Sequence, residues 1–155
     1  MDRPMIEVFD IVIIFFLILI SLQDLKNKII PNSLTLGIIF LGVLKIIFFH
    51  LSFEMSFIGF GVYPIIFLII YGYGSDFFKK EIIGFGDIKL MSSLGFYLGY
   101  TGIYSIIIFY NIIFILSFGF VILDFILKKY KKNEEIAFAP FICIGFIIYK
   151  ILVNI

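Results

Sequence analysis

The chain has 155 residues, of which 63% are hydrophobic and 15% are charged, and its formal net charge is +1. A soluble domain is usually about 45–50% apolar and about 25% charged, so this composition argues against an ordinary soluble enzyme, a disordered tail or a nucleic-acid-binding protein. The single cysteine, Cys143, and the single histidine, His50, provide no disulfide framework and too few ligands for a zinc site. We therefore expect an integral membrane protein with one domain over residues 1–155.

Apolar runs recur along the whole chain, and a helix of about 20 mostly apolar residues is needed to cross a bilayer. The run nearest the N-terminus has no small-residue cleavage site after it, so we predict a retained span rather than a secretory signal. The third and fifth runs are the clearest and the fourth is the shortest. The sequence predicts an all-α membrane protein with six transmembrane helices, at about residues 8–22, 34–49, 57–74, 88–100, 103–127 and 136–153.

The basic residues are unevenly distributed over the loops that these six spans would create. Only Arg3, Lys45 and Lys150 fall on one face. Basic residues in short loops mark the cytoplasmic side, so we expect both termini to be non-cytoplasmic and the chain to lie in the plasma membrane. Nine of the 12 basic residues fall on the face predicted to be cytoplasmic: Lys26, Lys28, Lys79, Lys80, Lys89, Lys128, Lys129, Lys131 and Lys132.

Two acids, Asp24 and Asp87, sit where spans meet this predicted cytoplasmic face. Asp24 ends the first span and Asp87 begins the fourth, and an odd span ends on the side where an even span starts. The two carboxylates therefore share a face in either orientation. Acids buried in membranes are costly and tend to be functional, and two adjacent carboxylates share a proton. Such a pair can activate a water molecule by acid–base catalysis.

Structural roles also fit these two acids, and composition and spacing alone leave them open. Asp24 could be an interfacial acid near Lys26 and Lys28. Asp87 could cap the N-terminus of the fourth span, a common role for aspartate. A third acid, Asp124, precedes Lys128 by four residues, the spacing of a helical ion pair.

Three ordered blocks of residues resemble the prepilin peptidase family, the membrane aspartic peptidases of the GxGD type. The first block, at 24–36, is an Asp followed seven residues later by Pro, then Asn, Leu and Thr. The second, at 84–90, is Gly-x-Gly-Asp-x-Lys-Leu, and the match continues through 93–99. The third, at 137–141, is similar to a weaker block that usually contains Phe-Gly-Pro, and Ala139 departs from its glycine. Together the blocks extend from the first span to the sixth.

The resemblance implies that Asp24 and Asp87 are catalytic and activate a water that cleaves the basic leader of type IV pilin-like precursors. It also implies that the substrate is a membrane protein cut at the cytoplasmic face. Gly84 and Gly86 would let the backbone approach a substrate or take a positive φ. Lys89 would hold a substrate carbonyl or a lipid headgroup, or extend to the interface, and Pro31 would start the second span.

Some relatives in this family also N-methylate the new amino terminus and carry a four-cysteine zinc site. This chain has one cysteine, so we expect the short, peptidase-only form with no metal or other cofactor. The substrate within the pilin-like class and the oligomeric state are left open. Two alternatives remain: a catalytically inactive family member, and a small membrane subunit that uses the acids as a proton or cation site.

Two further groups of residues are predicted to have structural roles. Tyr97, Tyr100 and Tyr104 are candidate anchors at the outer membrane interface. Small residues let membrane helices approach closely, and we expect this role for Gly59, Gly61, Gly72, Gly74, Gly95, Gly99, Gly102, Gly119 and Gly145.

Overall fold

The computed structural model describes residues 3–78, 83–127 and 137–154, and this part of the chain is helical without any strand. The two N-terminal helices are α1 (Arg3–Asn27) and α2 (Asn32–Phe49). A segmented third rod follows, made of α3 (Phe53–Val62), α4 (Ile65–Ile69), the π-helical segment η1 (Ile70–Gly74) and α5 (Ser75–Phe78). The chain ends with α6 (Phe85–Leu98), α7 (Ile103–Ile126) and α8 (Ala139–Asn154). The predicted all-α membrane fold is confirmed.

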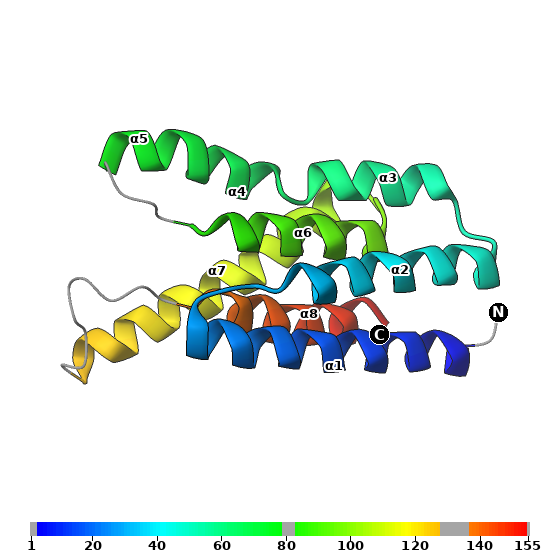
Figure 1. Cartoon of the computed structure of the whole chain (residues 1–155), viewed down its shortest axis with the longest axis horizontal. Coiled ribbons are helices and arrows are strands. Elements are labelled where there is room, and N and C mark those ends of the chain that lie inside the picture. The colour runs from blue at the N-terminus through cyan, green and yellow to red at the C-terminus, as the bar shows by residue number, and fades with distance from the viewer. Residues whose placement is uncertain (1–2, 79–82, 128–136, 155) are drawn as a thin grey trace.

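Within the part of the chain that the structure describes, four segments are long and apolar enough to cross a membrane: Val8–Asn27, Asn32–Phe49, Phe53–Gly74 and Ile103–Ile126. The C-terminal helix is apolar but shorter, and α6 has only 14 residues. These two shorter helices still lie alongside the long ones in one bundle (Figure 1). Large apolar side chains point outward from the spans, for example Ile115, Phe118 and Phe125 on α7, each about 70% exposed. In a bilayer these apolar side chains would contact lipid, whereas in a soluble protein they would be exposed to water at a free-energy cost.

The third span differs from its prediction at residues 57–74, because its helix begins four residues earlier and is broken at Pro64. A proline cannot donate the backbone hydrogen bond that would continue the helix. Near the break, the carbonyl oxygen of Tyr63 accepts a hydrogen bond from the Tyr110 hydroxyl of α7. That contact satisfies a buried polar group that would otherwise be costly in an apolar environment.

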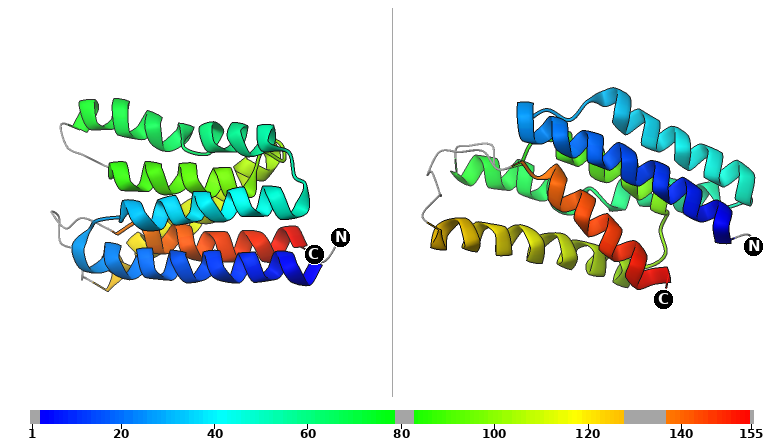
Figure 2. Two further views of the ribbon diagram at one scale, coloured as in Figure 1. Left: turned by 45° about the vertical axis from the view of Figure 1, so that its right-hand side comes forward. Right: turned by 90° about the horizontal axis from the view of Figure 1, so that it is seen from below.

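The helix ends separate into two groups. The ends of α1 and α7 and the starts of α2, α6 and α8 lie at the left of Figure 1, and the start of α1 and the end of α8 lie at the right (Figures 1 and 2). Thus the structure brings the Asp24 and Asp87 positions to one end of the bundle, which we call the aspartate end. The other end, where α2 passes to α3 and α6 passes to α7, is called the distal end.

α6 packs against α2 and α3, α8 packs against α1 and α7, and α1 packs against α2. α3 and α6 approach each other closely, and a Cβ on Gly59 would overlap the carbonyl oxygen of Gly95. This result confirms the expectation of close helix contact for Gly59 and Gly95, and Gly145 packs similarly against Ile113. The expectation is wrong for the glycines that have open space beside them, which are Gly61, Gly72, Gly102 and Gly119.

Candidate active site

Asp24 lies in the last turn of α1 and is only 6% exposed. Its Oδ2 accepts a hydrogen bond of 3.0 Å from the backbone N–H of Ala139, the first residue of α8. A helix N-terminus carries unsatisfied N–H groups and a partial positive charge, both of which stabilise an anion. The start of α8 therefore fixes the position of the Asp24 carboxylate.

Asp87 lies in the first turn of α6 and is 8% exposed. Its N–H donates to the carbonyl oxygen of Gly84 at 3.0 Å, and Gly84 itself is the N-cap residue. The alternative in which Asp87 caps the helix is therefore wrong, because that position belongs to a glycine three residues earlier. Within the described part of the chain, Asp87 Oδ1 is buried and has no hydrogen-bond partner.

The two carboxylates act on each other electrostatically. Asp87 precedes the apolar run at 88–100 and lies outside the four long spans. Burial raises the pKa of Asp87 from its ordinary value to about 7, and the Asp24 carboxylate contributes to this rise in the same direction. Among the described residues, neither aspartate forms an ion pair within 4.0 Å. Asp24 is thus a buried acid held by α8, rather than an interfacial partner of the exposed Lys26 or Lys28.

Lys89 is directed toward the start of α2. Its Nζ donates to Asn32 Oδ1 at 2.8 Å, in an exposed contact between two helices. The ammonium also lies 5.3 Å from the centroid of the Phe85 ring. Lys89 therefore connects the first two of the three resembling blocks, because Asn32 belongs to the first and Lys89 to the second.

The two motif glycines have different surroundings, and neither has a positive φ. A Cβ on Gly86 would lie 3.1 Å from Ile30 Cβ, so Gly86 allows the start of α6 to pack on the turn between α1 and α2. Gly84 is exposed, and a Cβ there would make only an ordinary contact with Asp87 Oδ2 at 3.4 Å. Pro31 was predicted to occupy the first helical position of the second span. It is instead the N-cap residue, one position before α2 begins at Asn32.

Three contacts at this site were not anticipated from the sequence: the Ala139 N–H on Asp24, Asn32 on Lys89 and Ile30 on Gly86. All three residues, Ala139, Asn32 and Ile30, lie inside the resembling blocks. The partners of Ala139 and Asn32 are 115 and 57 positions away along the chain. Such pairings depend on how the helices assemble.

A resident metal ion has no evident ligand set in the described residues, where no three His, Cys, Asp or Glu side chains come together. Lys128 lies outside the described residues, so its pairing with Asp124 stays a prediction. The arrangement at the aspartate end is therefore a pair of buried carboxylates, one of which accepts a helix N–H donor. Two such groups can hold a water between them and move its protons.

A membrane-embedded helical bundle with two buried carboxylates at one end is the class of protein that this fold defines. The family model described as the type IV leader peptidase family matches residues 11–123, which include both aspartates. The chain belongs to this family.

Two curated proteins are similar to the chain. The first, a prepilin leader peptidase/N-methyltransferase of Pectobacterium carotovorum subsp. carotovorum, is 23% identical over 139 residues, which are 87% of this chain and 48% of the relative. The second, a protein of the same name from Xanthomonas campestris pv. campestris, is 29% identical over 104 residues, 66% of this chain and 36% of the relative. The chain therefore spans about half or less of these relatives. No solved structure matches it significantly.

Proposed function

We propose that the chain is an aspartic endopeptidase that removes the short basic leader from type IV pilin-like precursors, with Asp24 and Asp87 as its catalytic residues. The observation that carries the proposal is the pair of buried carboxylates contributed by the end of α1 and the start of α6. Membership in the type IV leader peptidase family supports this class of reaction. The two relatives named above carry a prepilin leader peptidase name, which supports this class of substrate.

The different surroundings of the two acids support different roles for them. Asp24, which accepts the Ala139 N–H, is the carboxylate that takes a proton from the attacking water. Asp87, which is buried and has a raised pKa, carries the proton that passes to the carbonyl oxygen of the scissile peptide. The water oxygen bonds to the carbonyl carbon and the C–N bond then breaks. The proton held by Asp24 leaves with the new amine, and one hydroxyl proton of the tetrahedral intermediate returns to Asp87 as the carboxyl product forms.

The proposed face of cleavage is the cytoplasmic one. Lys26 and Lys28 lie at the end of α1, and Lys89 lies near the start of α6. Basic residues favour the cytoplasmic side of short loops. A pilin-like precursor would place its apolar segment among the spans and leave its basic leader in the cytoplasm. The proposal covers peptide cleavage without metal or other cofactor and does not include methyl transfer, although both relatives' names include it.

The direct test is a cleavage assay with purified protein in maltoside micelles and a synthetic precursor containing a basic leader, Gly, Phe and an apolar helix. We expect one cut after the glycine, an unmethylated new amine by mass spectrometry, and full activity after exhaustive chelation. Loss of cleavage on chelation that one divalent ion restores would contradict the two-carboxylate mechanism. A site for transported cations would instead tolerate Asp24→Glu and Asp87→Glu and would release no leader.

A further inference from the structure

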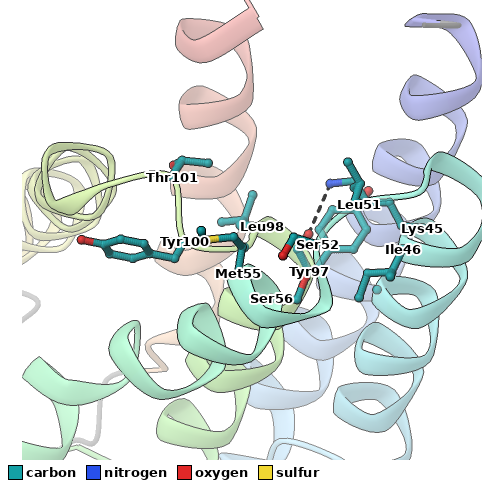
Figure 3. Close-up of a pocket in the computed structure, with 12 residues that line it drawn as sticks. Lys45, Ile46, Leu51, Ser52, Met55, Ser56, Tyr97, Leu98, Tyr100 and Thr101 are labelled. Atoms are coloured by element: carbon teal, nitrogen blue, oxygen red, sulfur yellow. Dashed lines mark hydrogen bonds between the residues drawn. The ribbon is translucent and has the colours of Figure 1, made fainter.

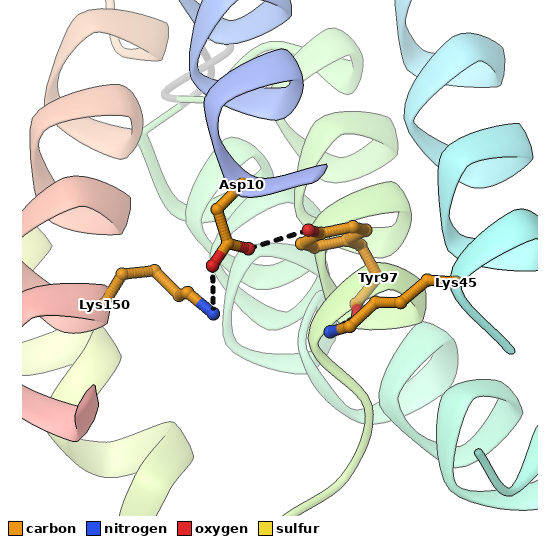
Figure 4. A network of polar contacts seen from close by, with 4 residues as sticks. All are labelled: Asp10, Lys45, Tyr97 and Lys150. Atoms are coloured by element: carbon orange, nitrogen blue, oxygen red, sulfur yellow. Dashed lines mark hydrogen bonds and ion pairs between the residues drawn. The ribbon is translucent and has the colours of Figure 1, made fainter. Parts of the chain in front are cut away.

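A second polar cluster lies near the distal end of the bundle, inside the apolar core. Asp10 of α1 is 7% exposed, and its two carboxylate oxygens have different partners (Figure 4). Asp10 Oδ1 accepts the Tyr97 hydroxyl at 2.7 Å, and Asp10 Oδ2 pairs with Lys150 Nζ at 2.7 Å. Tyr97 is 2% exposed, so the prediction that it anchors the outer interface is wrong; it is the buried centre of this cluster.

A second ammonium, that of Lys45 on α2, lies on the other side of Tyr97 (Figure 4). Lys45 Nζ donates to the Tyr97 carbonyl oxygen at 3.2 Å and lies 4.4 Å from the centroid of the Tyr97 ring. Among the described residues, Lys45 has no carboxylate within 4.0 Å. The cluster thus contains two cations and one carboxylate, and a half-buried cation without an anion is costly.

A cavity of about 230 Å³ opens beside this unpaired ammonium. Its wall includes Lys45, the hydroxyl-bearing Ser52 and Thr101, and the apolar side chains of Ile46 and Leu98 (Figure 3). Ser52 belongs to the connection between α2 and α3, and Thr101 belongs to the connection between α6 and α7. The cavity therefore lies where the spans end, at the depth of the lipid headgroups.

We propose that this distal cavity binds the phosphate of an anionic phospholipid headgroup, with Lys45 as its counter-ion. The phosphate would neutralise the excess positive charge of the cluster and accept hydrogen bonds from hydroxyls in the wall. The apolar part of the wall suits the glycerol and the first acyl carbons, which a soluble anion lacks. This binding site is independent of the proposed peptidase activity.

The test compares thermal unfolding of the full chain in maltoside micelles with added phosphatidylglycerol, phosphatidylcholine or inorganic phosphate. The buried Cys143 is the only cysteine, so a thiol-reactive fluorogenic dye reports unfolding. We expect saturating phosphatidylglycerol to raise the Tm by roughly 5 °C. Phosphatidylcholine and inorganic phosphate should raise it by less than about one fifth of that amount.

Lys45→Gln should abolish the response to phosphatidylglycerol, and Lys45→Arg should keep it. Lys26→Gln, an exposed lysine at the aspartate end, is the matched control and should respond like the wild type. Native mass spectrometry of the wild type should show one retained phosphatidylglycerol, which keeps the test valid if Lys45→Gln does not fold. The proposal would be overturned by equal Tm shifts with all three additives or by a full shift with inorganic phosphate alone. It would also be overturned if no lipid were retained, or if Lys45→Gln responded as strongly as the wild type.

Discussion

The two ends of this bundle both bury an aspartate of α1 beside a polar group of α6, with opposite electrostatic results. Asp10 and Asp24 are 14 positions apart, about 21 Å along the helix. Asp10 is neutralised by Lys150 and hydrogen-bonded by Tyr97. Among the described residues, Asp24 has one N–H donor and interacts electrostatically with a second carboxylate, Asp87, whose Oδ1 has no hydrogen-bond partner.

This difference indicates which end of the bundle stabilises the fold and which end carries out the reaction. A satisfied buried ion pair holds helices in register but has no group free to react. An under-satisfied acid pair is costly to the fold and is the arrangement that binds and polarises a water. The distal end is therefore expected to determine stability, and the aspartate end to determine cleavage.

The largest expected effect is on cleavage by Asp24→Asn and Asp87→Asn. Each variant should lose at least about 10³-fold in kcat, because the amide cannot exchange the required proton. Both should fold, since an amide oxygen at position 24 can still accept the Ala139 N–H and the change at position 87 removes a buried charge. The Tm of Asp87→Asn at pH 8 should be no lower than that of the wild type. Asp124→Asn is the matched control and should retain cleavage; near-normal processing by either dyad variant would refute the mechanism.

Asp10→Asn should show the reverse pattern. It leaves the Lys150 ammonium without a carboxylate, so we expect the free energy of unfolding to fall by about 3 kcal/mol and the Tm to fall by roughly 5–10 °C. Cleavage per folded molecule should stay within about threefold of the wild type, since the contacts of Asp24 and Asp87 are unchanged. A large loss of kcat with an unchanged Tm would show that the two ends are not separate in function.

The pH dependence of cleavage should report the aspartate end. The pKa of Asp87 is raised from 3.8 to about 7, so Asp87 keeps its proton below that pH and loses it above. Activity should therefore fall above about pH 7, approaching tenfold per pH unit. Rate measurements from pH 5 to 9 in micelles check this. A flat profile through pH 9 would contradict a proton held on Asp87.

The N–H donor on Asp24 should contribute a smaller, measurable amount. Ala139→Pro removes that donor, and the first helical position tolerates proline, because Phe138 before it is not helical. A hydrogen bond to a charged group is worth about 1.5–3 kcal/mol, so we expect kcat to fall by about tenfold or more. Ala139→Gly keeps the N–H and is the control. Equal kcat values for the two variants would show that the N–H donor of α8 does not contribute to cleavage.

The sequence predicted the parts of this molecule that depend on local pattern. Apolar runs located the helices, and the order of the spans placed Asp24 and Asp87 at one end. The sequence analysis missed the break at Pro64, although a proline is itself a local signal for such a break. It also missed the helical start of α6 at Phe85, which packs on the turn between α1 and α2. Burial of Tyr97 was missed for a related reason: a tyrosine near a span end is amphipathic, and only the position of Asp10 on another helix decides that it turns inward.

The smallest effect is expected from the exposed contact of Lys89 with Asn32, and it decides between two roles for Lys89. If the lysine only connects α6 to α2, Lys89→Met and Asn32→Ala should each lower the free energy of unfolding by about 0.5–1 kcal/mol. The double variant should then cost no more than either single one, because both remove the same bond. If Lys89 instead holds a substrate carbonyl, Lys89→Met should raise KM several-fold while Asn32→Ala leaves it unchanged. We expect the first result, because the Lys89 ammonium already lies 2.8 Å from Asn32 Oδ1.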